Sequence, residues 1–85
     1  MSTDDKLAYR ILQSKPVPNN ITPKELRSLA QQLGWRVEEG AGSHTKFYLP
    51  TPSGKTKMYP IPLGNVKEVK ACYIKDIRKI MSGED

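Results

Sequence analysis

The sequence predicts a small α+β domain in which a three-stranded antiparallel sheet is covered on one face by helices. Two segments with helical spacing come first, three short segments with strand-like alternation follow, and one more helical segment ends the chain. Turns containing Gly or Pro separate these segments. The 85 residues contain no internal repeat and no long linker. We therefore expect a single domain over residues 1–85 with the order α-α-β-β-β-α.

The first and last helices are predicted from apolar residues at helical spacing. Residues 4–14 form a short amphipathic helix, and the prolines within residues 16–18 end it. Residues 66–81 form the last helix, whose apolar stripe consists of Val66, Val69, Tyr73, Ile77, Ile80 and Met81. Tyr73 is thus expected in the core, and its neighbour Cys72 is expected to be inert. Lysines and an arginine occupy much of the rest of this helix, most often a solvated face.

The second helix has the clearest boundaries. Thr22 is the expected N-cap, with Pro23 at the first helical position and Glu25 completing a capping box. Ile21 and Leu26 are placed as a hydrophobic staple. The expected buried stripe and C-terminal cap are Leu26, Leu29, Ala30, Leu33 and Gly34.

Three strands are expected over residues 35–39, 43–49 and 55–61, joined by a turn at 40–42 and a hairpin loop at 51–54. Pro60 and Pro62 cannot donate to a ladder, so the far end of the third strand is expected at an edge of the sheet or outside it.

A four-residue loop predicts the register of this hairpin and therefore its two faces. Pro50 would pair with Lys55, and each later pair follows in step, so that Phe47 meets Met58. The face toward the helices would carry Phe47, Leu49, Thr56 and Met58. The solvent face would carry His44, Lys46, Tyr48, Lys55, Lys57 and Tyr59.

Charge and composition narrow the class of protein. A net charge of +5 and a pI near 9.5 favour polyanionic partners such as RNA, anionic membrane or an acidic protein. One cysteine, Cys72, cannot form an internal disulfide, and a single histidine with no second cysteine cannot assemble a structural zinc site. No apolar stretch approaches the roughly 20 residues of a membrane span, and the first residues are acidic where a signal peptide is basic. These features predict a cytoplasmic protein.

The predicted solvent face combines cations, aromatic rings, phenol hydroxyls and an imidazole, as an RNA-binding surface does. Lysine and tyrosine also suit exposed strands and protect edges from aggregation, which is the alternative explanation. The candidate RNA-binding residues are Ser43, Lys46, Tyr48, Lys55, Lys57 and Tyr59. A lone histidine is usually an ordinary surface residue, but His44 follows Gly42-Ser43 and shares the face with lysines. His44 is therefore the candidate catalytic residue.

The segment Gly42-Ser43-His44-Thr45-Lys46-Phe47 resembles the HicA family of toxin mRNA interferases. The likeness extends over residues 21–81, from the helix that ends at Leu33-Gly34-Trp35 to the final segment 73–78, and leaves 1–20 as an N-terminal extension and 82–85 as a tail. Many members carry a second histidine where this chain has Thr45, and a longer-form branch of the family has an extra N-terminal helix.

The resemblance implies a fold like that of double-stranded-RNA-binding domains, cleavage of mRNA without metal or cofactor, and neutralisation by a HicB-type antitoxin. His44 matches the catalytic histidine of the family. In such a reaction a base takes the proton of a 2′-hydroxyl, that oxygen attacks the adjacent phosphorus, and an acid protonates the leaving 5′-oxygen. Lys46 and Lys57 are the candidates for stabilising the phosphorane, and Tyr48, Tyr59 or Lys46 for the second proton transfer.

Two other functions remain open at this stage. A non-catalytic RNA-binding module could use the same basic face, with His44 contacting only the backbone of the RNA. A structural protein-interaction domain would show neither cleavage nor salt-dependent binding of RNA.

Overall fold

The computed structural model describes residues 3–40 and 42–83. Its elements are the helices and strands α1 (Thr3–Leu12), α2 (Pro23–Leu33), β1 (Arg36–Glu39), β2 (His44–Pro50), β3 (Thr56–Pro62) and α3 (Ala71–Ser82). The predicted α+β class and the three-stranded antiparallel sheet are thus confirmed. Ala41, in the predicted turn, lies outside the described residues.

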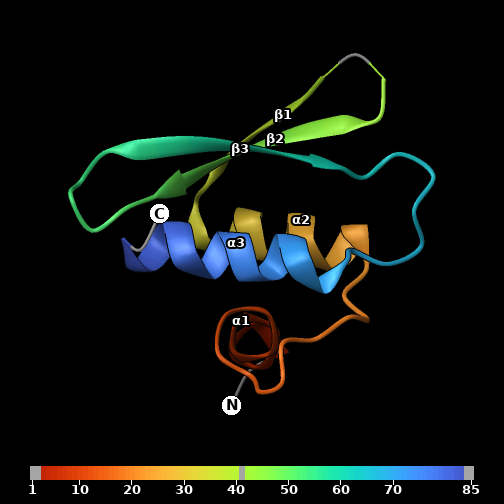
Figure 1. Cartoon of the computed structure of the whole chain (residues 1–85), viewed down its shortest axis with the longest axis horizontal. Coiled ribbons are helices and arrows are strands. Elements are labelled where there is room, and N and C mark those ends of the chain that lie inside the picture. Colours follow the sequence, from red (N-terminus) through yellow and green to blue (C-terminus); the bar gives the residue numbers. More distant parts are fainter. Residues whose placement is uncertain (1–2, 41, 84–85) are drawn as a thin grey trace.

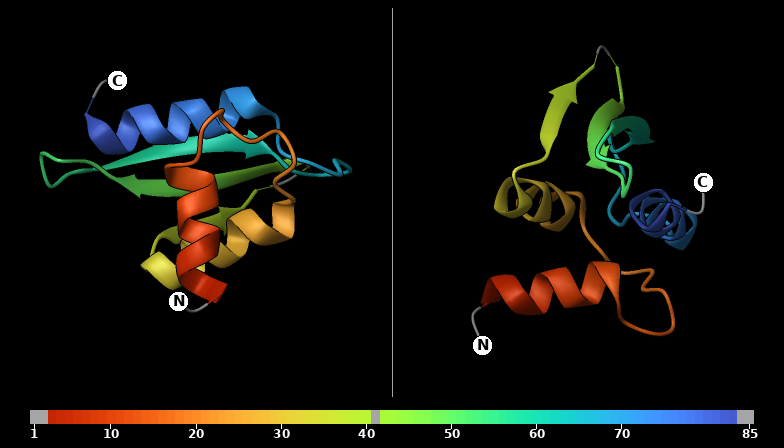
Figure 2. Two further views of the ribbon diagram at one scale, coloured as in Figure 1. Left: turned by 90° about the horizontal axis from the view of Figure 1, so that it is seen from below. Right: turned by 90° about the vertical axis from the view of Figure 1, so that its left-hand side faces the viewer.

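The molecule has three layers, which Figure 1 shows edge-on. The sheet, in the order β1-β2-β3, forms the first layer, and α2 and α3 lie side by side against one of its faces. The third layer is α1, which packs beneath α2 and α3 and runs across them, as the two views of Figure 2 show. Among the described residues, no helix lies over the opposite face of the sheet.

The second helix forms as its sequence predicts. The Thr22 hydroxyl accepts a hydrogen bond from the Glu25 backbone N–H (3.1 Å), and the Glu25 carboxylate accepts one from the Thr22 N–H (3.0 Å). Ile21 and Leu26 are fully buried, and Gly34 caps the helix with a left-handed φ of 73°. The prediction is wrong for Leu33, which is the last residue of the helix and is 44% exposed.

The last helix begins at Ala71, so the prediction that it starts at residue 66 is wrong. The Val69 N–H donates to the Ile21 carbonyl at 2.6 Å, and the two residues form an isolated bridge. Extended backbone at residue 69 is incompatible with a helix. Val69 is nevertheless buried, whereas Val66 is exposed. Tyr73 is half-buried against the core, in the direction predicted.

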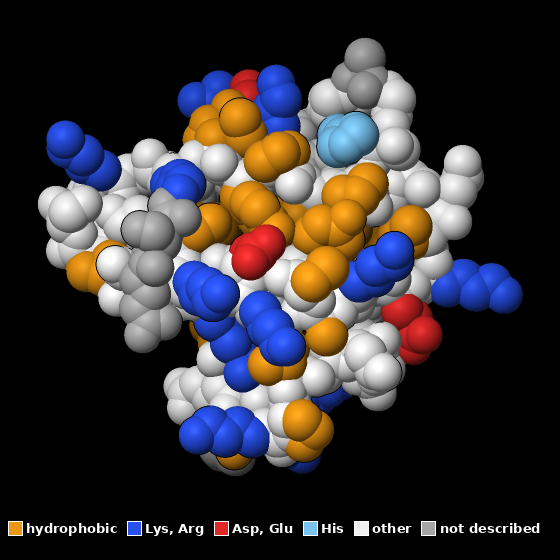
Figure 3. All heavy atoms as spheres, in the orientation of Figure 1, with side chains coloured by type: hydrophobic (Ala, Val, Ile, Leu, Met, Phe, Trp, Pro, Cys, Tyr) orange, Lys and Arg blue, Asp and Glu red, His pale blue; other side chains and the backbone are white. Residues whose placement is uncertain are grey.

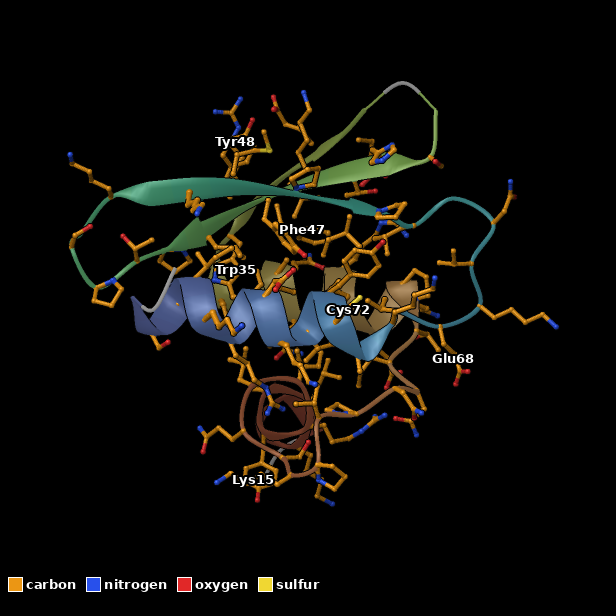
Figure 4. All side chains as sticks on the ribbon, in the orientation of Figure 1. Lys15, Trp35, Phe47, Tyr48, Glu68 and Cys72 are labelled. Carbon is orange, nitrogen blue, oxygen red and sulfur yellow. The ribbon has the colours of Figure 1, made fainter. Side chains whose placement is uncertain are left out.

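The core lies between the sheet and the two covering helices. Phe47 and Leu49 of β2 and Ile61 of β3 are fully buried there. From the other layer, Ile11 of α1 closes the core below. In Figure 4, Phe47 points from the sheet toward the helices, and Trp35, which precedes β1, lies on the same side of the sheet.

The side chain of Arg78 on α3 fastens α1 to the rest of the molecule. Its guanidinium donates to the backbone carbonyls of Ile11 (2.9 Å), Ser14 (3.0 Å) and Arg10 (3.3 Å). These carbonyls lie at and just beyond the C-terminal end of α1, where helix carbonyls lack partners within the helix. Burial lowers the pKa of Arg78, although the group stays charged.

Replacing Arg78 with alanine is expected to lower the free energy of unfolding by about 1–3 kcal/mol, because partly buried carbonyls lose a charged donor. Lys75→Ala, at an exposed position of the same helix, is the matched control and should change stability by less than about 0.5 kcal/mol. Urea unfolding followed by circular dichroism measures both. Equal losses in the two variants would contradict the role of Arg78.

Candidate active site

The sheet face that no helix covers, which we call the open face, holds His44. Residues alternate between the faces of a strand, and the burial of β2 alternates accordingly. Figure 4 shows Tyr48 on the side away from the helices, opposite to Phe47. The pairing of β2 with β1 and β3 then places these residues on the open face: Arg36, Glu38, His44, Lys46, Tyr48, Pro50, Thr56, Met58, Pro60 and Pro62.

His44 is the first residue of the central strand, and its side chain is exposed. The Gly40 N–H donates to the His44 carbonyl at 3.0 Å, which continues the ladder with the first strand. On the other side, His44 lies opposite Pro62. In Figure 3 the single histidine, in pale blue, lies at the surface. A rigid strand therefore presents this imidazole to solvent.

The residue before His44 is held by the loop that follows β3. The Ser43 carbonyl accepts hydrogen bonds from the Leu63 N–H (2.8 Å) and the Gly64 N–H (3.0 Å). The approach is close: a Cβ at residue 64 would lie 2.6 Å from the Ser43 Cβ and 2.8 Å from its Cα. Only glycine fits this contact, which fixes the backbone next to the imidazole.

Gly64→Ala is expected to lower the free energy of unfolding by about 1–3 kcal/mol, because the backbone of one of the two segments has to move. The control is Val66→Ala, at an exposed position of the same loop, which should be nearly neutral. Thermal unfolding compares the two proteins. A Gly64→Ala protein as stable as Val66→Ala would show that the contact at Ser43 is not tight.

Next to His44 on the open face lies Lys46, whose ammonium is exposed. Two residues along a strand span about 6.8 Å, so these side chains are neighbours on one face. Lys46 pairs with Glu38 across the ladder to β1. An imidazole and a lysine at this spacing can contact one phosphate group and its neighbourhood.

Tyr48 and the first strand form a connected polar group, the platform, made of Arg36, Glu38 and Tyr48. The Tyr48 hydroxyl donates to Glu38, Arg36 donates to Glu38 at 2.9 Å, and the guanidinium of Arg36 lies 5.1 Å from the centre of the Tyr48 ring. Arg36 and Glu38 thus form an ion pair on the open face. The bond from Tyr48 lowers the pKa of Glu38, and the same bond raises the pKa of Tyr48.

Thr45, the residue after His44, faces the helices. It is buried, its hydroxyl donates to Glu39 (3.2 Å), and it accepts from Arg27 of α2 (3.3 Å). Arg27 also pairs with Glu39 at 3.0 Å. A side chain at this position supports the sheet from below and does not share the open face with His44.

The predicted register of the hairpin is wrong by one residue. Pro50 pairs with Thr56, because Thr51 and Lys55 bond to each other: the Thr51 N–H donates to the Lys55 carbonyl at 3.0 Å. A shift of one residue moves every side chain of β3 to the other face. Met58 is therefore on the open face, 44% exposed, and not in the core.

This shift corrects the placement of three candidate RNA-binding residues. Lys57 and Tyr59 lie on the helix side of β3, and Lys55 lies in the hairpin loop. Lys57 and Tyr59 instead line a hollow of about 220 Å³ with Asp76, Lys79 and Ile80. The structure brings His44, Lys46 and Tyr48 together on the open face, with Ser43 directly before them.

The candidates for the second proton transfer are reduced accordingly. Tyr59 donates to Asp76 (2.6 Å) on the far side of the sheet, and burial together with this bond raises its pKa. Tyr48 is on the right face, but its proton is held by Glu38. Lys46 is the remaining candidate of the three, and it is also the lysine nearest to His44 along the strand.

The open face carries less positive charge than predicted. Of the described sheet residues, Lys46 and Arg36 are the cations on the open face, and Glu38 offsets one of them. Lysines and arginines gather instead over α3, as the blue side chains of Figure 3 show in the lower half of that view. The open face is consequently more apolar than the sequence pattern suggests.

Comparison with protein-family models, curated proteins and solved structures finds no match to this chain. Within residues 3–40 and 42–83, no three side chains of His, Cys, Asp or Glu come together as a metal site would require. In the same part of the chain, no helix has the length and apolar character of a membrane-spanning segment.

Proposed function

We propose that this protein is a ribonuclease of the HicA type, which cleaves mRNA at the open face with His44 as general acid or base. The observation that carries the proposal is the exposed imidazole at the start of the central strand, beside Lys46 on an uncovered face. An imidazole has both protonation states available near neutral pH, and a positioned acid or base contributes roughly 10²–10⁴-fold to the rate.

The sequence likeness around Ser43-His44 supports the same function. It also implies a toxin role, with a HicB-type antitoxin that covers this face. The order α2-β1-β2-β3-α3, with both helices on one face, suits the double-stranded-RNA-binding-like fold that the likeness implies. We include the fold label, the antitoxin and a cytoplasmic location in the proposal.

In the proposed reaction, His44 takes the proton of a 2′-hydroxyl, and that oxygen attacks the adjacent phosphorus. The bond to the 5′-oxygen breaks, and a protonated group such as Lys46 supplies the proton to the leaving oxygen. The products are a 2′,3′-cyclic phosphate and a 5′-hydroxyl. The positive charge of Lys46 also stabilises the negative charge that develops on the phosphorane oxygens.

Induced expression in bacteria tests the toxin role. The unmodified protein is expected to arrest growth, and His44→Ala, accumulating to the same level, is expected to relieve the arrest. Tyr9→Ala is a control at an exposed position on α1, far from the sheet, and should leave the arrest intact. Growth arrest by both His44→Ala and the unmodified protein would contradict a role for the imidazole.

A non-catalytic RNA-binding domain is the second candidate, and the cations of α3 favour it. Lys75 and Lys79 lie exposed on this helix, on the opposite side of the sheet from His44. RNA bound there would depend on salt but would not meet the imidazole. If Lys75→Ala and Lys79→Ala abolish RNA binding and no RNA is cleaved, this second function holds instead.

A further inference from the structure

The open face has a hollow at the end opposite to His44. It has a volume of about 380 Å³ and is lined by the C-terminal end of α2 and residues of all three strands: Leu33, Gly34, Trp35, Arg36, Tyr48, Pro50 and Thr56. Ligand pockets commonly begin near 300 Å³, so the volume suits one small, flat group. We call it the base hollow.

Planar and apolar surfaces dominate the walls of this hollow. The Tyr48 ring and the Arg36 guanidinium are stacked at 5.1 Å, and Glu38 fixes both through its two carboxylate oxygens. Leu33 contributes an apolar side chain that is 44% exposed, although it belongs to an otherwise buried stripe. The contacts with Glu38 hold the Tyr48 ring and the Arg36 guanidinium in place before any ligand arrives.

The charges of the platform argue against a phosphate ligand. Arg36 is paired with Glu38 at 2.9 Å, so a phosphate would have to approach a carboxylate. Stacking on a guanidinium or a phenol ring needs no net charge, and RNA-binding proteins use both surfaces to hold unpaired bases. The hydroxyl of Thr56 at the wall can exchange a hydrogen bond with a base edge.

We propose that the base hollow receives one unpaired nucleobase of the RNA strand whose phosphate lies beside His44; this inference rests on the proposed function. His44 and Tyr48 are four residues apart on β2, about 13 Å. A stacked strand rises 3.4 Å per nucleotide, so the bound base lies at most about four nucleotides from the cleaved bond and closer in an extended strand. The substrate segment is therefore single-stranded.

Binding of short RNA to the non-cleaving His44→Ala protein tests the hollow. A set of single-stranded ten-nucleotide RNAs each carries 2-aminopurine, whose fluorescence is quenched on stacking, at one position. Quenching is expected to be strongest at one position. Adding Tyr48→Ala should remove this maximum and weaken binding roughly tenfold. Leu33→Gln, an uncharged change at an exposed position, should weaken RNA binding by a smaller factor. This variant leaves the Tyr48–Glu38 bond intact, so it tests the hollow independently of that bond.

Tyr9→Ala is the matched control, since it removes an exposed tyrosine from α1 and should leave quenching and affinity unchanged. Equal quenching at all positions would contradict binding of a base in the hollow, and so would a maximum that survives both Tyr48→Ala and Leu33→Gln. The hollow would then suit an apolar side chain of a protein partner instead. Cleavage of RNA by the unmodified protein would still support the proposed function. A position-specific maximum without any cleavage would support the hollow and contradict the nuclease.

Discussion

His44→Ala is expected to lower the rate of RNA cleavage by at least about 10²–10⁴-fold, because the imidazole is the acid–base group of the proposed reaction. RNA affinity should stay within about threefold of the unmodified value, since the platform and the cations remain in place. The exposed position of His44 makes an effect on folding small. Initial rates with a fluorophore–quencher RNA, together with Kd values from anisotropy, separate the two quantities.

Two further variants sharpen this prediction. His44→Gln keeps a hydrogen-bonding side chain but cannot exchange a proton near neutral pH, so its rate should fall as far as that of His44→Ala. Lys46→Ala should lower the rate and also weaken binding, because it removes a cation beside the phosphate. Full activity in His44→Gln would show that the imidazole transfers no proton.

The second large effect concerns stability. Phe47→Ala is expected to cost about 3–5 kcal/mol of unfolding free energy, because the ring is fully buried where the central strand meets the helices. A domain of 85 residues has little stability in reserve, so this variant should be largely unfolded at 37 °C. Circular dichroism and urea unfolding measure the loss.

Met58→Ala, compared with Phe47→Ala, tests the register of the hairpin. The observed register leaves Met58 on the open face, 44% exposed, and the expected loss is below about 1 kcal/mol. In the register predicted from a four-residue loop, the same side chain would pair with Phe47 in the core and cost about 2–5 kcal/mol. Comparable losses for Phe47→Ala and Met58→Ala would therefore contradict the register of the structure.

The sequence predicts a helix boundary when the residues that fix this boundary are close together in the chain. The capping box of Thr22 and Glu25 depends on residues three apart and forms as expected. The start of the last helix depends on a distant residue: the bond from Val69 to Ile21 holds the chain extended. No pattern within residues 66–81 shows that partner.

The register of the hairpin could have been predicted from the need to bury Ile61 instead of from the length of the loop. Ile61 is fully buried, and it shares a face with Lys57 and Tyr59. A strand that buries its isoleucine must place these two residues on the helix side, whatever their polarity. The same register places Pro60 opposite Lys46. At this pair the backbone of β3 donates no hydrogen bond to β2, so proline, which has no N–H, fits there.

The candidate site was predicted in part, because its residues lie on one strand. His44, Lys46 and Tyr48 alternate along β2, and their common face follows from period two alone. The platform depends on β1 as well. The spacing of Arg36 and Glu38 puts them on one face of that strand, but nothing in the sequence shows that Tyr48 bonds to Glu38. The base hollow could not be predicted, because it forms where the end of α2 meets all three strands.

One measurement tests the central claim most directly. The unmodified protein is incubated in EDTA with a single-stranded RNA and, separately, with the same sequence carrying 2′-O-methyl groups. We predict cleavage of the unmodified RNA into ends with 2′,3′-cyclic phosphate and 5′-hydroxyl, and no cleavage of the methylated strand. Intact RNA, or products with 3′-hydroxyl and 5′-phosphate ends, would contradict attack by the 2′-oxygen at His44.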